Sequence, residues 1–135
     1  MNVMDILSIK ATASTPLVSF DPIIGMMHIS GRSIPENADD FWLPVLNWFE
    51  SYIISPCETT TFSISLEYFN ISSSKRILFL LYKLNELAEK GCNVKVEWNY
   101  RKEDEDMFEV GQDYAYMVKV PFEFKEYQEA DLAVA

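Results

Sequence analysis

The residues best suited to chemistry lie in one short polar stretch. Three consecutive serines, Ser72, Ser73 and Ser74, are followed directly by Lys75 and Arg76. Serine hydroxyls cap helices and also accept phosphate from protein kinases, while basic side chains attract an incoming negative charge. Two interpretations stay open: a serine cap beside two solvated basic residues, or a phosphoacceptor or contact site for an anionic partner. Spacing alone favours the simple cap.

The sequence places this stretch between a strand and a helix. Phe62, Ile64 and Leu66 alternate with polar residues, which predicts a strand. Apolar residues three and four apart then predict an amphipathic helix over 75–90, ended by a glycine. Residues 70–74 are therefore expected to form the turn before that helix, where unpaired backbone N–H groups and the helix dipole favour an anion.

The remaining patterns predict an α/β fold. Because early strands precede a strand–helix–strand–helix order, we expect a mixed β-sheet with helices mainly on one face, two main helices and a shorter C-terminal helix. The strand that contains Phe62 should lie centrally, with Phe62, Ile64 and Leu66 buried under the helices. Strands are predicted over 6–11, 17–20, 26–30, 60–68, 94–100 and 121–125, and helices over about 38–53, 75–90 and 106–117.

The first predicted helix contains a proline. Asn37 is a suitable N-cap, but Pro44 removes one helical hydrogen bond, so we expect the helix to bend near Leu43 or to begin late. Its many aromatic residues, among them Trp42 and Trp48, are interpreted as core rather than as a ligand site, although the width of the stripe could also serve a partner.

Composition limits the class of protein. The chain has 135 residues, 49% of them hydrophobic, which is enough for one self-folding domain over 1–127 with a frayed tail over 128–135. A formal net charge of −10 argues against nucleic-acid or anionic-membrane partners. Cys57 and Cys92 lack metal-ligand spacing and are interpreted as thiols, and no apolar run approaches a membrane span. A reducing bacterial cytoplasm fits best.

Enzymatic signatures are absent from the sequence. There is no nucleophile-elbow motif, phosphate-binding glycine loop or histidine pair, so neither catalysis nor a cofactor is expected. His28 is the single histidine and is interpreted as an ordinary strand residue. The acidic run over 103–106 lacks the spaced oxygens of a calcium loop and is interpreted as a loop and the first turn of a helix.

Several short motifs occur in a fixed order and spacing along the chain. They are Thr15-Pro16, Gly31-Arg32-Ser33 with Pro35-Glu36-Asn37, Tyr68-Phe69-Asn70 before Ser72-Ser73-Ser74-Lys75, Trp98-Asn99-Tyr100, and Asp104-Glu105-Asp106 with Gly111-Gln112-Asp113-Tyr114. Together these motifs resemble the SiaC family of bacterial regulatory phosphoproteins, over about residues 5–127, whose members resemble the STAS domain of anti-sigma-factor antagonists. The resemblance implies a non-enzymatic partner-switching protein that a Ser/Thr kinase phosphorylates and a metal-dependent phosphatase restores. The implied target is a regulator such as a diguanylate cyclase, in cyclic-di-GMP signalling and biofilm regulation, and the free protein is expected to be a monomer.

One position departs from the family pattern. The usual phosphoacceptor is a threonine directly after the asparagine, and Ile71 stands there instead. The resemblance then implies Ser72 as the nearest acceptor and Ser73 as the next. The alternative is a constitutive interaction module that has lost the phosphoswitch, and a small-molecule carrier using the aromatic stripe is the third candidate. The implied partner-binding residues are Asn70, Ile71, Ser74, Lys75 and Arg76.

Overall fold

The computed structural model describes residues 4–128, which form one six-stranded sheet and three helices. Most of the tail predicted over 128–135 lies outside the described residues. The strands are β1 (Leu7–Ile9), β2 (Leu17–Asp21), β3 (Met26–Ser33), β4 (Thr59–Phe69), β5 (Asn93–Arg101) and β6 (Phe122–Tyr127), and the helices are α1 (Ala38–Tyr52), α2 (Ile71–Glu89) and α3 (Glu105–Met117).

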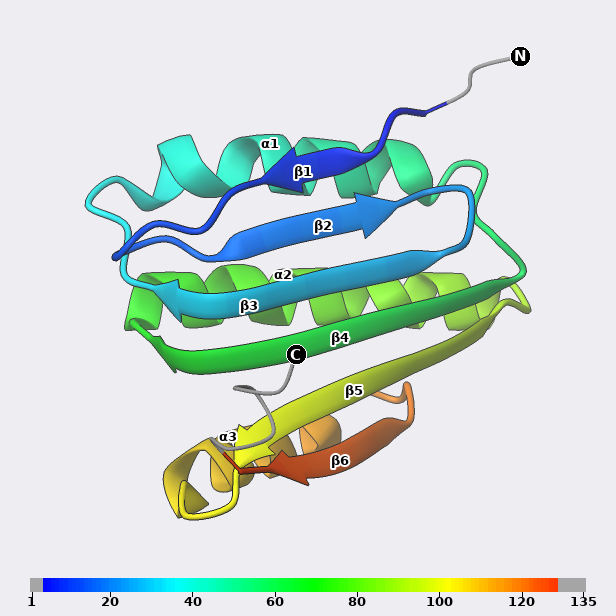
Figure 1. Cartoon of the computed structure of the whole chain (residues 1–135). Coiled ribbons are helices and arrows are strands. Elements are labelled where there is room, and N and C mark those ends of the chain that lie inside the picture. The colour runs from blue at the N-terminus through cyan, green and yellow to red at the C-terminus, as the bar shows by residue number, and fades with distance from the viewer. Residues whose placement is uncertain (1–3, 129–135) are drawn as a thin grey trace.

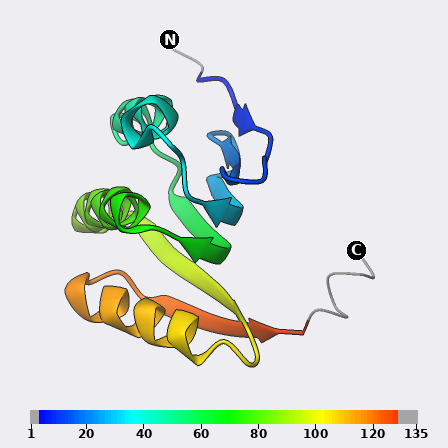
Figure 2. The same cartoon turned by 90° about the vertical axis from the view of Figure 1, so that its left-hand side faces the viewer.

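Strand order in the sheet follows strand order in the chain. β1, β2 and β3 pair antiparallel, and β3 to β6 pair parallel. One helix joins each parallel pair, and all three helices lie on the same face of the sheet (Figures 1 and 2). Parallel neighbours need such crossovers, and a common handedness brings them to one face. The predicted mixed sheet with helices on one face is confirmed, and β4 lies between β3 and β5 as expected.

The core fills the space between the sheet and the helices. β4 turns Phe62, Ile64 and Leu66 toward the helices, and each is at most 2% exposed. From α1, Trp42 and Phe49 are fully buried, and the ring centroids of Phe49 and Phe62 lie 6.4 Å apart. The aromatic residues of the first helix are therefore core, as predicted.

One helix start differs from the predicted position, and another agrees with its predicted cap. α2 begins at Ile71 rather than at Lys75, because Asn70 already caps the helix. α1 begins directly after its predicted cap Asn37 and continues through Pro44, so the late start, one of the two alternatives expected for this helix, is wrong. Pro44 and Asp40, whose carbonyl loses its helical donor to the proline, are both exposed, and water can satisfy that carbonyl.

Helices α1 and α2 run side by side in the same direction (Figure 1). Polar contacts join them near the start, near the middle and at the end of α2. These contacts are an ion pair of Arg76 with Asp39, an ion pair of Lys83 with Glu50 at 2.9 Å, and a hydrogen bond from Lys90 Nζ to the carbonyl O of Ile53 at 3.1 Å.

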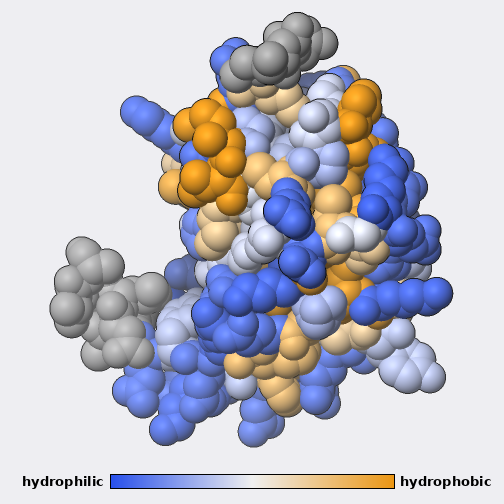
Figure 3. Space-filling model, turned by 90° about the vertical axis from the view of Figure 1, so that its right-hand side faces the viewer, coloured by the Kyte–Doolittle hydropathy of each residue, from blue (hydrophilic) through white to orange (hydrophobic). Residues whose placement is uncertain are grey.

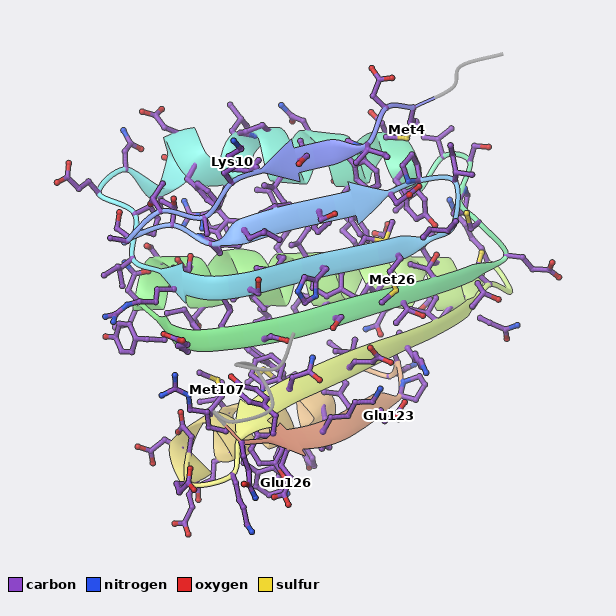
Figure 4. The ribbon with its side chains drawn as sticks, viewed as in Figure 1. Met4, Lys10, Met26, Met107, Glu123 and Glu126 are labelled. Carbon is purple, nitrogen blue, oxygen red and sulfur yellow. The ribbon has the colours of Figure 1, made fainter. Side chains whose placement is uncertain are left out.

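The other face of the sheet is polar, and no helix of residues 4–128 covers it (Figure 2). On β5 and β6, Glu97 pairs with Lys125 at 3.0 Å, and Lys95 pairs with Glu123 at 3.2 Å. Figure 4 shows the side chains along this face, with Glu123 labelled on β6. A shallow cavity of about 540 Å³ lies on the same face between β3, β4 and β5, lined in part by His28.

Candidate functional site

The predicted site forms the first turn of α2. Asn70 has extended backbone angles, and its side-chain Oδ1 accepts hydrogen bonds from the Ser73 backbone N–H at 2.9 Å and from the Ser72 hydroxyl at 3.0 Å. The Asn70 carbonyl accepts the first helical hydrogen bond, from the Ser74 N–H at 2.9 Å. An asparagine with this geometry is an N-cap. The serines that were predicted as the turn before the helix are therefore its first residues.

Ser73 is part of the core. Its side chain is fully buried, and its hydroxyl donates to the Ser33 carbonyl at 3.1 Å and lies 2.7 Å from the Ser33 hydroxyl. The same carbonyl accepts the Asn70 N–H at 3.0 Å. Ser33, at the end of β3, therefore anchors the start of α2 to the sheet (Figure 1). A kinase has no access to the Ser73 hydroxyl while these contacts hold.

Ser74 joins the site to α3. Its carbonyl accepts a hydrogen bond from the Tyr114 hydroxyl at 3.0 Å, and burial raises the pKa of Tyr114, which keeps that hydroxyl protonated. The Tyr114 ring stacks on Phe69, with centroids 6.5 Å apart. Phe69, just before the start of α2, and Ser74, in its first turn, are thus both held by Tyr114 of α3.

Ser72 and Ile71 remain at the surface. Ser72 is half-buried, and within residues 4–128 its hydroxyl bonds only to the Asn70 side chain. Ile71 is 77% exposed, and several other large apolar side chains of the described residues are also exposed, such as Ile54 at 81%. Of the three serines, Ser72 combines a surface position with a hydroxyl that is free of buried partners.

The two basic residues differ in their contacts. Arg76 forms an ion pair with Asp39 on α1 and donates to the Ser72 carbonyl at 3.3 Å. Lys75 is exposed, and no ion pair joins it to another residue of 4–128. Charge reversal at Arg76 would therefore disturb the packing of α1 on α2, and Lys75 is the cleaner probe of partner binding.

The start of α2 also differs from the other helix starts in charge. The first turns of α1 and α3 carry two acidic residues each, Asp39 with Asp40 and Glu105 with Asp106. The first turn of α2 carries none. Its positive dipole end is not offset by a carboxylate on its own helix, so added negative charge is electrostatically favoured there.

The other sequence candidates take structural roles. Asp104 caps α3 by accepting the Met107 N–H at 2.9 Å, so the acidic run is a loop and a helix start, as predicted. His28 lies in β3 beside the shallow cavity; burial lowers its pKa, and the nearby Glu97 opposes that shift. Within residues 4–128 no three His, Cys, Asp or Glu side chains gather as metal ligands do, and both cysteines are free thiols.

Comparison with known proteins identifies the family. The model of the SiaC family of regulatory phosphoproteins matches residues 9–127. The chain belongs to the SiaC family. The motifs quoted from the sequence thus point to the right family, and Asn70 with the serines of α2 lies within the matched range. In the described part of the chain, no helix has the length and apolar character needed to cross a membrane.

Solved SiaC structures share the whole fold. Apo-SiaC from Pseudomonas aeruginosa is 27% identical, with a TM-score of 0.83, and the match covers 90% of this chain and 99% of that one. SiaC in its crystal complex with the diguanylate cyclase SiaD, whose activator it is, gives 27% identity and a TM-score of 0.85 over the same shares. An uncharacterized protein of P. aeruginosa strain UCBPP-PA14 is 28% identical over 126 residues, which are 93% of this chain and all of the relative.

Proposed function

We propose that this chain is a partner-switching regulator that binds a target such as a diguanylate cyclase and is released when Ser72 is phosphorylated. The relative SiaC is an activator of the cyclase SiaD, and the two folds agree over nine tenths of this chain. The observation that carries the choice of residue is that Ser72 is accessible at a helix start without acidic residues, while Ser73 is fully buried.

The proposed modification is an ordinary kinase reaction. The Ser72 oxygen loses its proton and displaces ADP from the γ-phosphorus of ATP, and a metal-dependent phosphatase later hydrolyses the phosphate ester. The phosphate adds about −1.5 to −2 charge at pH 7 and three acceptor oxygens. The backbone N–H groups at the start of α2 and the helix dipole favour the negative charge of the phosphate. The modified domain should therefore stay folded, and phosphorylation should change the binding of the target.

The chain itself is proposed to be non-enzymatic and to act in the cytoplasm. Its partners in this proposal are a Ser/Thr kinase, a metal-dependent phosphatase and the target regulator. The binding surface includes the exposed residues of the turn, Ile71 and Lys75. Asn70, Ser74 and Arg76 hold that surface in place, since their polar groups contact Ser73, Tyr114 and Asp39.

A constitutive module is the second candidate, and one observation favours it. Ile71 stands where the family pattern has the threonine acceptor, and it is 77% exposed. An exposed apolar side chain at a binding surface adds contact area that a phosphate cannot directly switch. In this version the chain binds the same target but ignores the kinase.

The deciding experiment is phosphorylation by the cognate kinase with ATP, followed by peptide mass spectrometry. We expect one phosphate on Ser72, its loss in Ser72→Ala, and its retention in Ser73→Ala. Ser72→Asp should release the target from a folded domain, and Ile71→Thr should give a better kinase substrate. Absence of phosphate from the parent chain, with Ser72→Asp binding as tightly as the parent, would leave the constitutive module.

A further inference from the structure

The shallow cavity on the helix-free face of the sheet takes no part in the proposed switch. Its volume of about 540 Å³ lies within the range of about 300–1,000 Å³ that is usual for small-molecule sites. The lining residues come from β3, β4 and β5, with Tyr127 added from β6. Figure 4 looks onto this face, and all three helices lie behind the sheet in that view. A ligand in the cavity would therefore not contact α2.

Short side chains form the floor of the cavity. Ser30 of β3 pairs in register with Ser65 of β4. Two residues earlier in each strand, His28 pairs with Ser63. Gly31, which also lines the cavity, has a φ angle of +107° and no side chain. Serine and glycine rise little above the backbone, so the longer side chains around them leave a hollow that a small ring can enter.

A β-bulge shapes the rim of the cavity. The register between β3 and β4 shifts after Gly31, and Glu67 is left without a partner on β3. The extra residue of a bulge stands outside the ladder, and the strand bends there. The Glu67 side chain lies at the cavity, and its Oε1 accepts a hydrogen bond from Arg101 at 3.2 Å. Because β-bulges are over-represented beside functional sites, where they redirect a side chain, this one supports a binding role for the cavity.

Uncharged hydrogen-bonding groups converge on the cavity. Asn99 Nδ2 donates to Ser63 Oγ and to the Ile64 carbonyl O, both at 3.1 Å. These bonds fix the amide, and within residues 4–128 no donor pairs with its Oδ1. In the same part of the chain, the hydroxyls of Ser30 and Ser65 also have no hydrogen-bond partner. A ligand could therefore pair with one amide oxygen and two hydroxyls that are already in place.

The ionisable groups at the cavity are paired or neutral. Glu67 forms an ion pair with Arg101. Burial lowers the pKa of His28, which the nearby Glu97 opposes only in part, and burial raises the pKa of Tyr127. The His28 and Tyr127 side chains are therefore uncharged at pH 7. Because the whole chain also carries a net charge of −10, an anionic ligand such as a nucleotide is disfavoured.

We propose that this cavity is a binding site for a nucleoside, a neutral molecule that combines a planar ring with hydroxyl groups. The base would stack on the phenol ring of Tyr127, which is the usual contact between a base and an aromatic side chain. Asn99 Oδ1 and the serine hydroxyls would pair with the polar edge of the base. The neutral His28 ring, with one donor and one acceptor nitrogen, would bind the ribose hydroxyls.

A free monosaccharide shares the hydroxyl groups but has no planar ring, so it should bind more weakly. The inference is independent of the proposed function, because Ser72 lies on α2, on the other side of the sheet.

The test titrates the ¹⁵N-labelled full chain with each of the four ribonucleosides, with AMP and with glucose, followed by ¹H–¹⁵N NMR. We expect saturable shifts of the Gly31, Ser65 and Asn99 amide signals with at least one nucleoside. Glucose should bind at least fivefold more weakly than that nucleoside, and AMP at least threefold more weakly than adenosine.

Substitutions locate the site. Ser65→Leu would fill the floor of the cavity and should weaken nucleoside binding at least tenfold. Ser8→Leu is the matched control, because Ser8 lies in β1 on the same face, in register with Ser19, and outside the cavity; it should change the affinity less than twofold. Tyr127→Leu should weaken binding at least fivefold, whereas Tyr127→Phe keeps the ring and should bind within twofold of the parent.

A second control checks for non-specific adhesion of the base to exposed apolar side chains. Ile24 in the β2–β3 turn is 68% exposed, at the end of the molecule that Figure 3 views, where apolar surface appears in separate patches. Ile24→Ser should leave nucleoside binding unchanged, and thermal melts show that every variant is folded.

Three results would overturn the inference. The first is no saturable shift with any of the four nucleosides. The second is nucleoside binding that is as tight in folded Ser65→Leu and Tyr127→Leu as in the parent chain. The third is a preference for another probe: glucose binding as tightly as the best nucleoside would make a sugar the ligand, and AMP binding more tightly than adenosine would make it an anion.

Discussion

Aspartate in place of Ser73 should severely destabilise the domain, whereas aspartate in place of the adjacent Ser72 should not. The Ser73 side chain is fully buried, and its two oxygen contacts, at 2.7 and 3.1 Å, are both with Ser33. A carboxylate there would lose its hydration, and in return it would gain at most one hydrogen bond, from the Ser33 hydroxyl, since the Ser33 carbonyl donates none. At Ser72 the carboxylate would stay in contact with water.

The expected magnitudes follow from these contacts. Ser73→Ala removes two hydrogen bonds, each worth about 0.5–1.5 kcal/mol, so the free energy of unfolding should fall by about 1–3 kcal/mol. Ser73→Asp adds an unpaired buried charge, which brings the loss to about 3–5 kcal/mol or more. Ser72→Asp loses one exposed hydrogen bond but gains about 0.3–1 kcal/mol from the helix dipole, so its net change should be within about 1 kcal/mol.

Urea unfolding followed by circular dichroism at pH 7 measures all three variants. Because a domain of this size is typically stable by about 5–15 kcal/mol, Ser73→Asp should lose a large share of its stability or fail to fold. A Ser73→Asp variant as stable as the parent would refute the buried position of this hydroxyl. It would also reopen Ser73 as a phosphoacceptor.

Three further predictions test other parts of the structure. Gly111→Ala should destabilise by about 1–3 kcal/mol despite the higher helix propensity of alanine, because the added Cβ would lie 2.5 Å from the Trp98 ring; a higher melting temperature would contradict this packing. Asn70→Ala should cost about 0.5–2 kcal/mol in urea unfolding through loss of the α2 cap, and an unchanged midpoint would count against it. Burial lowers the pKa of His28 in the folded state, so the unfolded state binds a proton first and stability should fall as pH drops below about 6.5. His28→Gln should flatten that part of the stability–pH profile, and identical profiles would show that His28 is not responsible.

Periodicity predicted the elements well where one face of each is buried. Phe62, Ile64 and Leu66 alternate with polar residues because the helices cover only one face of β4. The same alternation predicted the central position of β4, which lies between β3 and β5. Boundaries were less accurate where capping decides them. The start of α2 was placed at Lys75 because the apolar spacing begins there, but the helix begins where the Asn70 side chain satisfies the first N–H groups.

The candidate site was only partly readable from the sequence. The polar stretch and its place at a helix N-terminus could be found by composition, but the difference between Ser72 and Ser73 depends on a contact with Ser33, forty residues away. Similarly, the ion pair of Arg76 with Asp39 joins two helices, and no local sequence pattern predicts this pair. Residues that stabilise a site from other elements leave no short-range signal.

The three contacts between α1 and α2 also bear on how a signal can travel through this protein. Because two ion pairs and one hydrogen bond tie them together, the two helices cannot slide past one another without breaking all three contacts. Motions on the microsecond to millisecond timescale should therefore be small in this pair. A partner would then recognise modified and unmodified molecules by their surface charge alone, and the two forms should give nearly superimposable backbones.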